Sequence, residues 1–230
     1  MKYSLIIFDF DGTIADTNRV IINTMQAVIR ELGLPARTDA ECQSTIGLPL
    51  VAVPSVLFAD TDLTPELYAD TYRRLFDNYN TPDAVTLFEG VRDTLIALHE
   101  AGCILTIASS RCVDSLKNYT VTLHMEGLFS YLLGAESVEH PKPNAEPVLK
   151  TLEHLGIPAN EALVVGDMTY DILMAQNAGV ATCAVTYGND TLSNLRSCTP
   201  DFIIDHFSDL LEIVKPLPSS PRPHPRLLPA

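Results

Sequence analysis

The chain contains 230 residues, 47% of them hydrophobic, and carries a formal net charge of -14 at pH 7. This length allows one α/β domain with a smaller insertion, whereas the acidic balance argues against a nucleic-acid partner, which needs clustered lysine and arginine. No stretch approaches the roughly 20 apolar residues of a membrane span, so we expect no membrane partner.

The cysteines favour a reducing compartment. They are odd in number and include no Cys-x-x-Cys pair: Cys42, Cys103, Cys112, Cys183 and Cys198. Reduced thiols of this kind are typical of a cytoplasmic protein. The first apolar stretch is interrupted at Asp9, too early for a signal peptide. We therefore predict a cytoplasmic protein.

The first predicted element is a buried strand, Leu5–Phe8, an apolar run that ends in a turn at Gly12. Asp9 and Asp11 follow this strand. Because strand side chains alternate, both carboxylates begin on the same side, although the turn could re-aim the second. Two anions this close need a cation, and Mg²⁺ prefers oxygen ligands. The alternative is a pair of solvated acids that cap the next helix.

The next part of the chain predicts helices without a strand. Apolar residues recur at helical spacing over Ala15–Leu32, Val51–Phe58 and Leu67–Tyr79. We therefore predict an all-helical inserted domain over residues 16–83, with residues 1–15 and 84–215 forming the α/β core. The insert is either a mobile lid or an ordinary helical subdomain without motion.

From Phe88 onward, strands alternate with helices. Strands are predicted at Ile104–Ala108, Tyr131–Leu133, Ala162–Val165, Ala181–Val185 and Phe202–Ile204. Helices are predicted at Val91–Glu100, Asp114–Met125, Ala145–Leu155, Ile172–Ala178 and Phe207–Val214. This alternation predicts a doubly wound parallel sheet, in which ligands bind beyond the carboxyl ends of the strands.

The end of the chain, residues 216–230, is rich in proline. Such a composition predicts an extended or disordered tail. A proline segment that binds a partner is the alternative.

Several polar residues at predicted strand ends can carry chemistry. Ser109 follows an apolar strand, where its hydroxyl and N–H could hold a phosphate oxygen, with Ser110 beside it. Arg111 could assist there or lie on the surface. Thr13, next to a glycine that permits close backbone approach, could also donate to a phosphate oxygen, and helix capping is its other role.

Lys142 and two further aspartates complete the candidate set. Prolines on both sides of Lys142 stiffen its backbone and would hold its cation in place; a solvated loop lysine is the alternative. Asp167 lies at a strand end, and Asp171 could face the same side of the helix that follows. Both could instead cap that helix.

Four motifs in this order resemble those of the haloacid dehalogenase-like hydrolase superfamily. They are Asp9-x-Asp11-Gly12-Thr13, Ser109 after a strand, Lys142 before a proline, and Gly166-Asp167-x-x-x-Asp171. The resemblance covers about the first 215 residues. It implies a Rossmann-like α/β core, and it implies that the helical insert is a cap over the active site.

The resemblance also implies roles. Asp9 would attack phosphorus and Asp11 would be the general acid/base, while Ser109 and Lys142 complete the catalytic set. Mg²⁺ is the implied cofactor, held by Asp9, Asp11 through its backbone carbonyl, Asp167, and Asp171 directly or through water. Substrate contacts are expected from Thr13, Ser109, Ser110 and Lys142.

Within the superfamily, the chain resembles the branch of phosphoglycolate phosphatase, pyrophosphatase-like enzymes and β-phosphoglucomutase. Residues 45–50 are similar to the cap loop of that branch, or are a plain turn between helices. The absence of an arginine near Leu50 favours a hydrolase over a mutase.

The function implied is Mg²⁺-dependent hydrolysis of a small phosphomonoester, such as phosphoglycolate, through an aspartyl-phosphate at Asp9. The alternatives are a phosphosugar mutase, a pyrophosphatase and a protein that binds phosphometabolites without catalysis. The expected partner is a small phosphorylated substrate, and both a monomer and a homodimer remain open.

Overall fold

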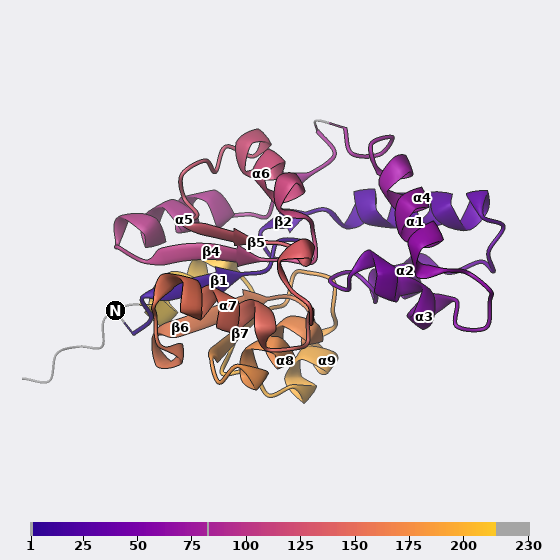
Figure 1. The fold of residues 1–230 in the computed structure, drawn as a ribbon. Coiled ribbons are helices and arrows are strands. Elements are labelled where there is room, and N and C mark those ends of the chain that lie inside the picture. The colour runs from indigo at the N-terminus through magenta and orange to yellow at the C-terminus, as the bar shows by residue number, and fades with distance from the viewer. Residues whose placement is uncertain (1, 82, 215–230) are drawn as a thin grey trace, which may run out of the picture.

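A computed structural model describes residues 2–81 and 83–214 (Figure 1). Its centre is a six-stranded sheet in the order β5-β4-β1-β6-β7-β8, and every neighbouring pair is parallel. The strands are β1 (Leu5–Phe8), β4 (Ile104–Ala108), β5 (Tyr131–Leu133), β6 (Ala162–Gly166), β7 (Ala181–Val185) and β8 (Phe202–Ile204). The predicted parallel sheet is confirmed, with β6 one residue longer than expected.

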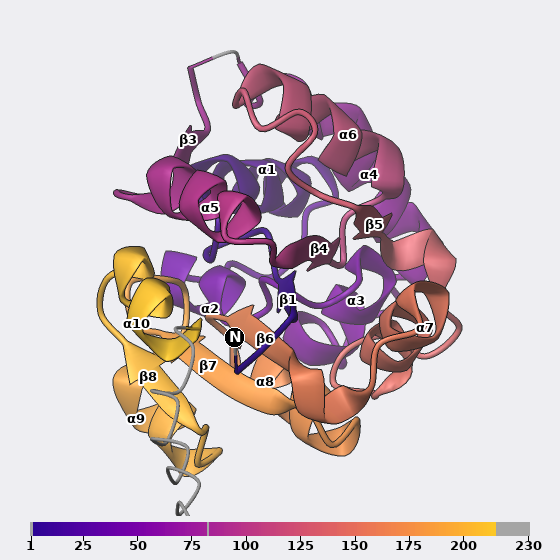
Figure 2. The same cartoon turned by 90° about the vertical axis from the view of Figure 1, so that its left-hand side faces the viewer.

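Helices cover both faces of this sheet (Figures 1 and 2). One face packs against α5 (Val91–Glu100), α6 (Val113–Thr122) and α10 (Leu210–Val214). The other packs against α7 (Glu146–Leu155), α8 (Thr169–Asn177) and α9 (Leu192–Ser197). Short 3-10 turns lie at Ala135–Ser137, Ala159–Glu161 and Phe207–Asp209. Two covered faces explain why the strands are apolar without interruption.

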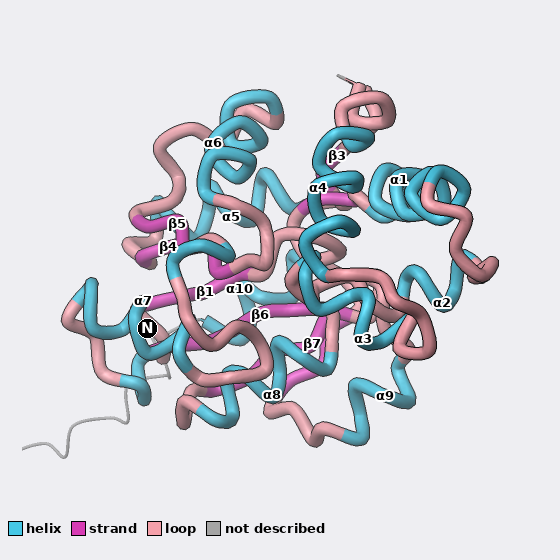
Figure 3. Tube along the Cα trace, turned by 45° about the vertical axis from the view of Figure 1, so that its right-hand side comes forward, coloured by secondary structure: helices cyan, strands magenta, loops and turns pink. Residues whose placement is uncertain are grey.

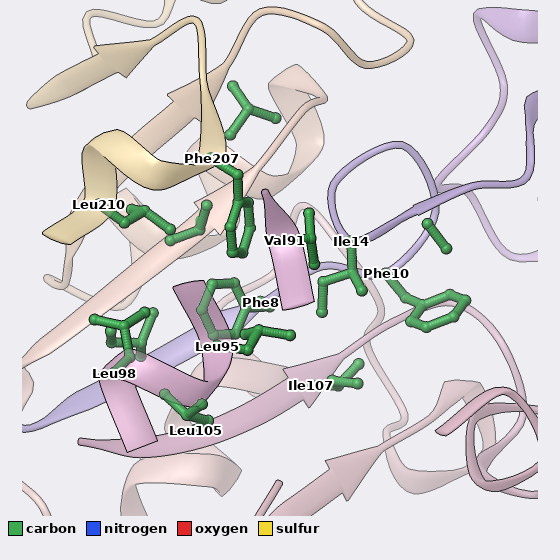
Figure 4. Packing of buried hydrophobic residues seen from close by; sticks show 14 of the residues in the cluster. Phe8, Phe10, Ile14, Val91, Leu95, Leu98, Leu105, Ile107, Phe207 and Leu210 are labelled. Atoms are coloured by element: carbon green, nitrogen blue, oxygen red, sulfur yellow. The ribbon is translucent and has the colours of Figure 1, made fainter. Parts of the chain in front are cut away.

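The core follows from the alternation of strand side chains. Phe8 points into the cluster beneath α5 and α10, where its ring stacks on that of Phe207 with centroids 5.5 Å apart (Figure 4). Leu5 and Ile7, on the opposite face, pack against α7 and α8. Each such side chain contributes about 1.5–3 kcal/mol when fully buried.

A helical part (residues 18–76) lies beyond one end of the sheet (Figures 1 and 3). It contains α1 (Asn18–Glu31), α2 (Asp39–Gln43), the 3-10 turn Leu50–Ala52, α3 (Val53–Leu57) and α4 (Pro65–Phe76). These elements enclose a hydrophobic cluster of their own, which includes Met25, Val28 and Tyr68. The helical part therefore has a core separate from that of the sheet.

Two chain segments connect the helical part to the sheet. They pair as a small antiparallel sheet of β2 (Ala15–Asp16) and β3 (Thr86–Leu87). This pairing explains why α1 begins at Asn18 and not at the expected Ala15. Neither strand was expected, because two residues show no alternation. The helices α2 and α9 were also not predicted separately, since each has only five or six residues.

Three further expectations concern the whole chain. The proline-rich tail, residues 216–230, lies outside the described residues. All five cysteines are free thiols. Within residues 2–81 and 83–214, no helix is long and apolar enough to cross a membrane.

Candidate active site

The predicted site residues meet at the carboxyl edge of the sheet. Asp9 follows β1, Ser109 follows β4 and Asp167 follows β6, and these three strands are neighbours. Lys142 reaches the same place from the loop before α7, and all four residues are buried. Parallel strands bring residues distant in sequence to one edge in this way.

Lys142 lies between two aspartates. Its Nζ is 2.5 Å from Oδ1 of Asp9 and 2.6 Å from Oδ1 of Asp171. Burial disfavours the ammonium, but the charges of Asp171 and Asp9 outweigh burial and raise the pKa of Lys142 above its ordinary value. Lys142 is therefore a permanent cation beside Asp9, and the alternative of a solvated loop lysine is wrong.

Asp171 has a second contact besides Lys142. Its Oδ2 accepts a hydrogen bond of 3.1 Å from the backbone N–H of Met168, at the start of α8. The capping role and a role in the site thus coexist in one side chain. Gly166 makes room for it, because a Cβ there would lie 2.3 Å from the Asp171 Cβ.

Asp167 is fully buried and held on both oxygens. Oδ1 accepts from the Thr13 hydroxyl at 2.9 Å, while Oδ2 accepts from the N–H and the side-chain amide of Asn189 at 2.8 and 3.0 Å. Burial, followed by the charge of Asp171, raises the pKa of Asp167 to about 7 despite these bonds. Thr13, expected on the substrate, contacts Asp167 in this structure.

The arrangement of carboxylates suits a divalent cation. Oxygens of Asp9, Asp167 and Asp171 lie within 4.8 Å of one another. Oδ2 of Asp9 is buried and accepts no hydrogen bond from the described part of the chain. Burial, only partly offset by Lys142, raises the pKa of Asp9, and the neighbouring carboxylates add to it. Three acids against one lysine fit a hard cation with oxygen ligands.

Gly12 allows the first motif to approach this cluster. Its φ is +89°, and a Cβ at this position would lie 2.2 Å from Oδ2 of Asp167. A side chain here would therefore be strained and would also collide with the carboxylate. The turn that follows Asp11 needs a glycine for both reasons.

Asp11 forms its ion pair with Arg111, whereas Asp9 is paired with Lys142. Arg111 Nε lies 2.8 Å from each Asp11 oxygen, and a second guanidinium nitrogen lies 2.7 Å from Oδ1. The Thr17 hydroxyl donates to the same Oδ1 at 2.6 Å. The turn thus re-aims Asp11 away from Lys142. Arg111 belongs to the site, and its alternative placement on the surface is wrong.

The two serines after β4 have different surroundings. Both serines, together with Lys142, line a small cavity that extends to Pro49 of the helical part. The Ser110 hydroxyl donates to the backbone carbonyl of Gly47 at 2.6 Å. The Ser109 hydroxyl accepts from the backbone N–H of Arg111 at 3.2 Å, whereas the Ser110 hydroxyl connects the sheet side to the helical part.

The sequence did not identify Thr17 or Asn189 as site residues. It left Arg111 open between the site and the surface. Asn189 follows β7, at the carboxyl edge where ligands bind, so its strand-end position could have marked it. Arg111 shares a turn with Ser109. No sequence signal pointed to Thr17, whose contact depends on how the chain leaves Gly12.

Comparison with known proteins agrees with this geometry. Residues 6–185 match the family described as haloacid dehalogenase-like hydrolase. The chain is 36% identical to "Probable phosphatase IndB" of Dickeya dadantii, over 90% of this chain and 91% of that protein. It is 33% identical to "Pyrophosphatase PpaX" of Halalkalibacterium halodurans, over 93% and 98%.

A solved structure shows the same fold. The structure of a predicted phosphoglycolate phosphatase from Haemophilus somnus superposes with a TM-score of 0.82 at 25% identity, covering 94% of this chain and 99% of that one. The family match includes all four motifs, from Asp9 to Asp171. The chain therefore belongs to the haloacid dehalogenase-like hydrolase family.

Proposed function

We propose that the chain is a Mg²⁺-dependent phosphatase that hydrolyses a small phosphomonoester through an aspartyl-phosphate at Asp9. The observation that carries this proposal is Oδ2 of Asp9, a buried oxygen without a hydrogen-bond donor in the described residues. The other oxygen of Asp9 is fixed by Lys142. Asp9 therefore offers one held and one free oxygen, as an in-line nucleophile requires.

The residues divide the reaction into two steps. Oδ2 of Asp9 forms a bond to phosphorus, the ester P–O bond breaks, and Asp11 gives its proton to the leaving oxygen. Asp11 then takes a proton from water, whose oxygen attacks phosphorus and displaces Asp9. Ser109 and Lys142 contact the phosphoryl oxygens in both steps. The products are an alcohol and inorganic phosphate, and the enzyme is regenerated.

Mg²⁺ would be held by Asp9, Asp167 and the backbone carbonyl of Asp11, with Asp171 binding directly or through water. When bound, it offsets the negative charge of the phosphoryl group. Lys142 and Asp171 orient Asp9 beside it. The raised pKa values of Asp9 and Asp167 support this assignment, because they mark carboxylates that lack sufficient positive charge.

The helical part is proposed to be a cap over this site, with the domain boundaries predicted at residues 16–83. Its separate hydrophobic core and the paired strands β2 and β3 support independent movement. The loop at residues 45–50 would close over the substrate, because the carbonyl of Gly47 contacts Ser110, next to Ser109.

The test is phosphate release from a panel containing phosphoglycolate, sugar phosphates, nucleotides and pyrophosphate, with Mg²⁺ and with chelator. We expect Mg²⁺-dependent release concentrated in one phosphomonoester. Preference for pyrophosphate would favour the second candidate, a pyrophosphatase, which the relative of that name supports. Interconversion of sugar phosphates without phosphate release would indicate a mutase, and release that persists in chelator would contradict the metal assignment.

A further inference from the structure

Arg111 lies in the turn between β4 and α6, where 11% of its side chain is exposed. Its guanidinium carbon is 4.9 Å from the ring centre of Tyr119, 5.9 Å from that of Phe10 and 5.4 Å from that of Phe76. The first two rings belong to the sheet side, and Phe76 belongs to α4 of the helical part. Arg111 is therefore a cation held at the boundary between the two parts.

The charge of Arg111 is balanced by Asp11. Among residues 2–81 and 83–214, Asp11 is the one carboxylate within ion-pair distance of its guanidinium. Aromatic faces can support a cation without fixing its hydrogen-bond partner. A planar guanidinium can bind any carboxylate or phosphate in the same two-pronged way. The site thus holds an anion-binding group whose present partner can be replaced.

The hydrogen bonds of Asp11 do not match its proposed role as a proton donor. Oδ1 accepts from Thr17 and from Arg111, and Oδ2 accepts from Arg111. A protonated carboxyl has one O–H besides its remaining acceptor sites, and the guanidinium that contacts both oxygens of Asp11 fixes the direction in which this O–H can point. We expect Asp11 to give up its bonds to Arg111 when it turns toward the leaving oxygen.

Arg111 is also close to the place where a leaving group would lie. Its backbone N–H donates to the hydroxyl of Ser109 at 3.2 Å, so the phosphate site and the guanidinium share one turn. In an in-line displacement, the leaving oxygen lies opposite the nucleophile Asp9 and beside the proton donor. Because Arg111 contacts that donor, it borders the leaving group.

We propose that Arg111 binds an anionic substituent on the substrate's leaving group, exchanging Asp11 for it, so that the enzyme prefers phosphomonoesters with a second negative group. This inference rests on the proposed phosphatase function. The exchange keeps the guanidinium paired while it frees Asp11 to approach the leaving oxygen. A substrate with a neutral leaving group lacks this partner and leaves Arg111 on Asp11.

The test compares phosphoglycolate with 2-hydroxyethyl phosphate, whose leaving group has similar size and no charge. The variant Arg111→Met removes the guanidinium but keeps an unbranched side chain against the rings. We expect kcat/KM for phosphoglycolate, divided by kcat/KM for 2-hydroxyethyl phosphate, to be on the order of 100-fold lower in Arg111→Met than in the wild-type enzyme. Arg111→Lys should retain part of the preference.

Arg73→Gln is the matched control, because it removes the same charge from α4, where Arg73 is exposed and pairs with Asp70. It should leave the ratio unchanged. Equal losses on both substrates in Arg111→Met would overturn the inference, since a purely structural role lowers both alike. A wild-type enzyme that hydrolyses both esters without preference would overturn it while the phosphatase proposal stands.

Two further outcomes are informative. If Arg111→Met does not fold, inhibition of the wild-type enzyme decides: glycolate should inhibit at least about tenfold more strongly than ethylene glycol, and equal inhibition overturns the inference. If the wild-type enzyme hydrolyses no member of the full phosphomonoester panel, the proposed function fails and the inference fails with it.

Discussion

Two buried ion pairs flank the first motif, and they differ in what surrounds them. Lys142 is 2% exposed at its side chain and contacts both Asp9 and Asp171. Arg111 is 11% exposed and contacts Asp11 alone among the carboxylates of the described residues. The first pair lies at the carboxyl edge of the sheet, in a loop cavity that Pro49 of the helical part borders. The second touches the helical part through Phe76.

The difference suggests a division of labour between two aspartates two residues apart. Asp9 is buried and paired with Lys142 inside the sheet side, which suits the proposed nucleophile, since it must stay aligned with phosphorus. Asp11 sits at a boundary between two separately packed parts, where a proton donor can change its partner as substrate enters. Substitutions on the two sides should break this contrast, with the largest effects at Asp9 and Asp11 themselves.

Variants of the proposed nucleophile, Asp9, and of the proposed acid/base, Asp11, should differ in whether they release a burst of product. Asp9→Asn should lower turnover on the order of 10⁴-fold or more, with no burst of product, because no phosphoenzyme can form. Asp11→Asn should still give a burst with 4-nitrophenyl phosphate, whose leaving group needs no proton. Rapid-mixing measurements of nitrophenolate release distinguish the two. Asp70→Asn, at an exposed position, is the control, and a burst in Asp9→Asn would refute the assignment.

Loss of the enclosed cation should destabilise the protein. Lys142→Met leaves Asp9, Asp167 and Asp171 buried together, which should lower the free energy of unfolding by about 3–5 kcal/mol. Urea denaturation in chelator measures this change. Adding Asp171→Asn should recover part of the loss, because it removes one of the crowded charges. If the double variant were no more stable than the single one, repulsion among the acids would not be the cause.

The sheet was predictable because its strands are apolar on both faces. The strands Leu5–Phe8 and Ile104–Ala108, for example, have the bounds that were predicted for them. Helix ends were less predictable: α1 starts later than expected because β2 pairs with β3, a contact across about 70 residues of chain. Local patterns carry no information about such a pairing.

The candidate site shows the same limit. Each aspartate and Lys142 could be predicted, because a strand end or flanking prolines marked its position. Their partners could not, because the direction of Asp11 depends on the positive φ at Gly12 and on where the turn after β4 places Arg111. Which cation serves which aspartate is a property of the folded chain.

The enclosed carboxylates should make stability depend on pH and metal. The pKa of Asp167 rises from an ordinary 3.8 to about 7, chiefly through burial. Between these values the folded protein holds a proton that the unfolded chain has lost, so stability is highest below about pH 4 for this group and decreases as pH rises to about 7. At about 1.4 kcal/mol per pKa unit, the decrease is on the order of 2–4 kcal/mol.

Urea midpoints measured in chelator from pH 5 to pH 8 check this expectation. Asp167→Asn should remove the decrease, which separates Asp167 from the other titrating groups. Mg²⁺ should also reduce the decrease in the wild-type protein, since a bound cation favours the ionised carboxylates. A midpoint that rises with pH equally in both proteins would contradict the raised pKa.

The smallest effect should come from Asn189, which links the metal candidates to the helical part. Its amide holds Oδ2 of Asp167, its side-chain oxygen accepts from Asn18, and its backbone carbonyl accepts from Gln43. Asn189→Ala should weaken Mg²⁺ binding about tenfold, because Asp167 loses the side-chain amide that helps to orient it. Calorimetric titration of the substrate-free protein measures this, and Asn194→Ala, which is exposed, is the control.

The same amide lies 3.4 Å from the backbone carbonyl of Asp11, another proposed Mg²⁺ ligand. If Asn189→Ala instead tightened Mg²⁺ binding, the amide would be competing with the cation for both oxygens. The helical part would then regulate the metal site through Asn18 and Gln43, because they hold Asn189 in place. Weaker binding in Asn189→Ala, with a smaller loss in Gln43→Ala, would show that the helical part supports the metal site by the same contacts.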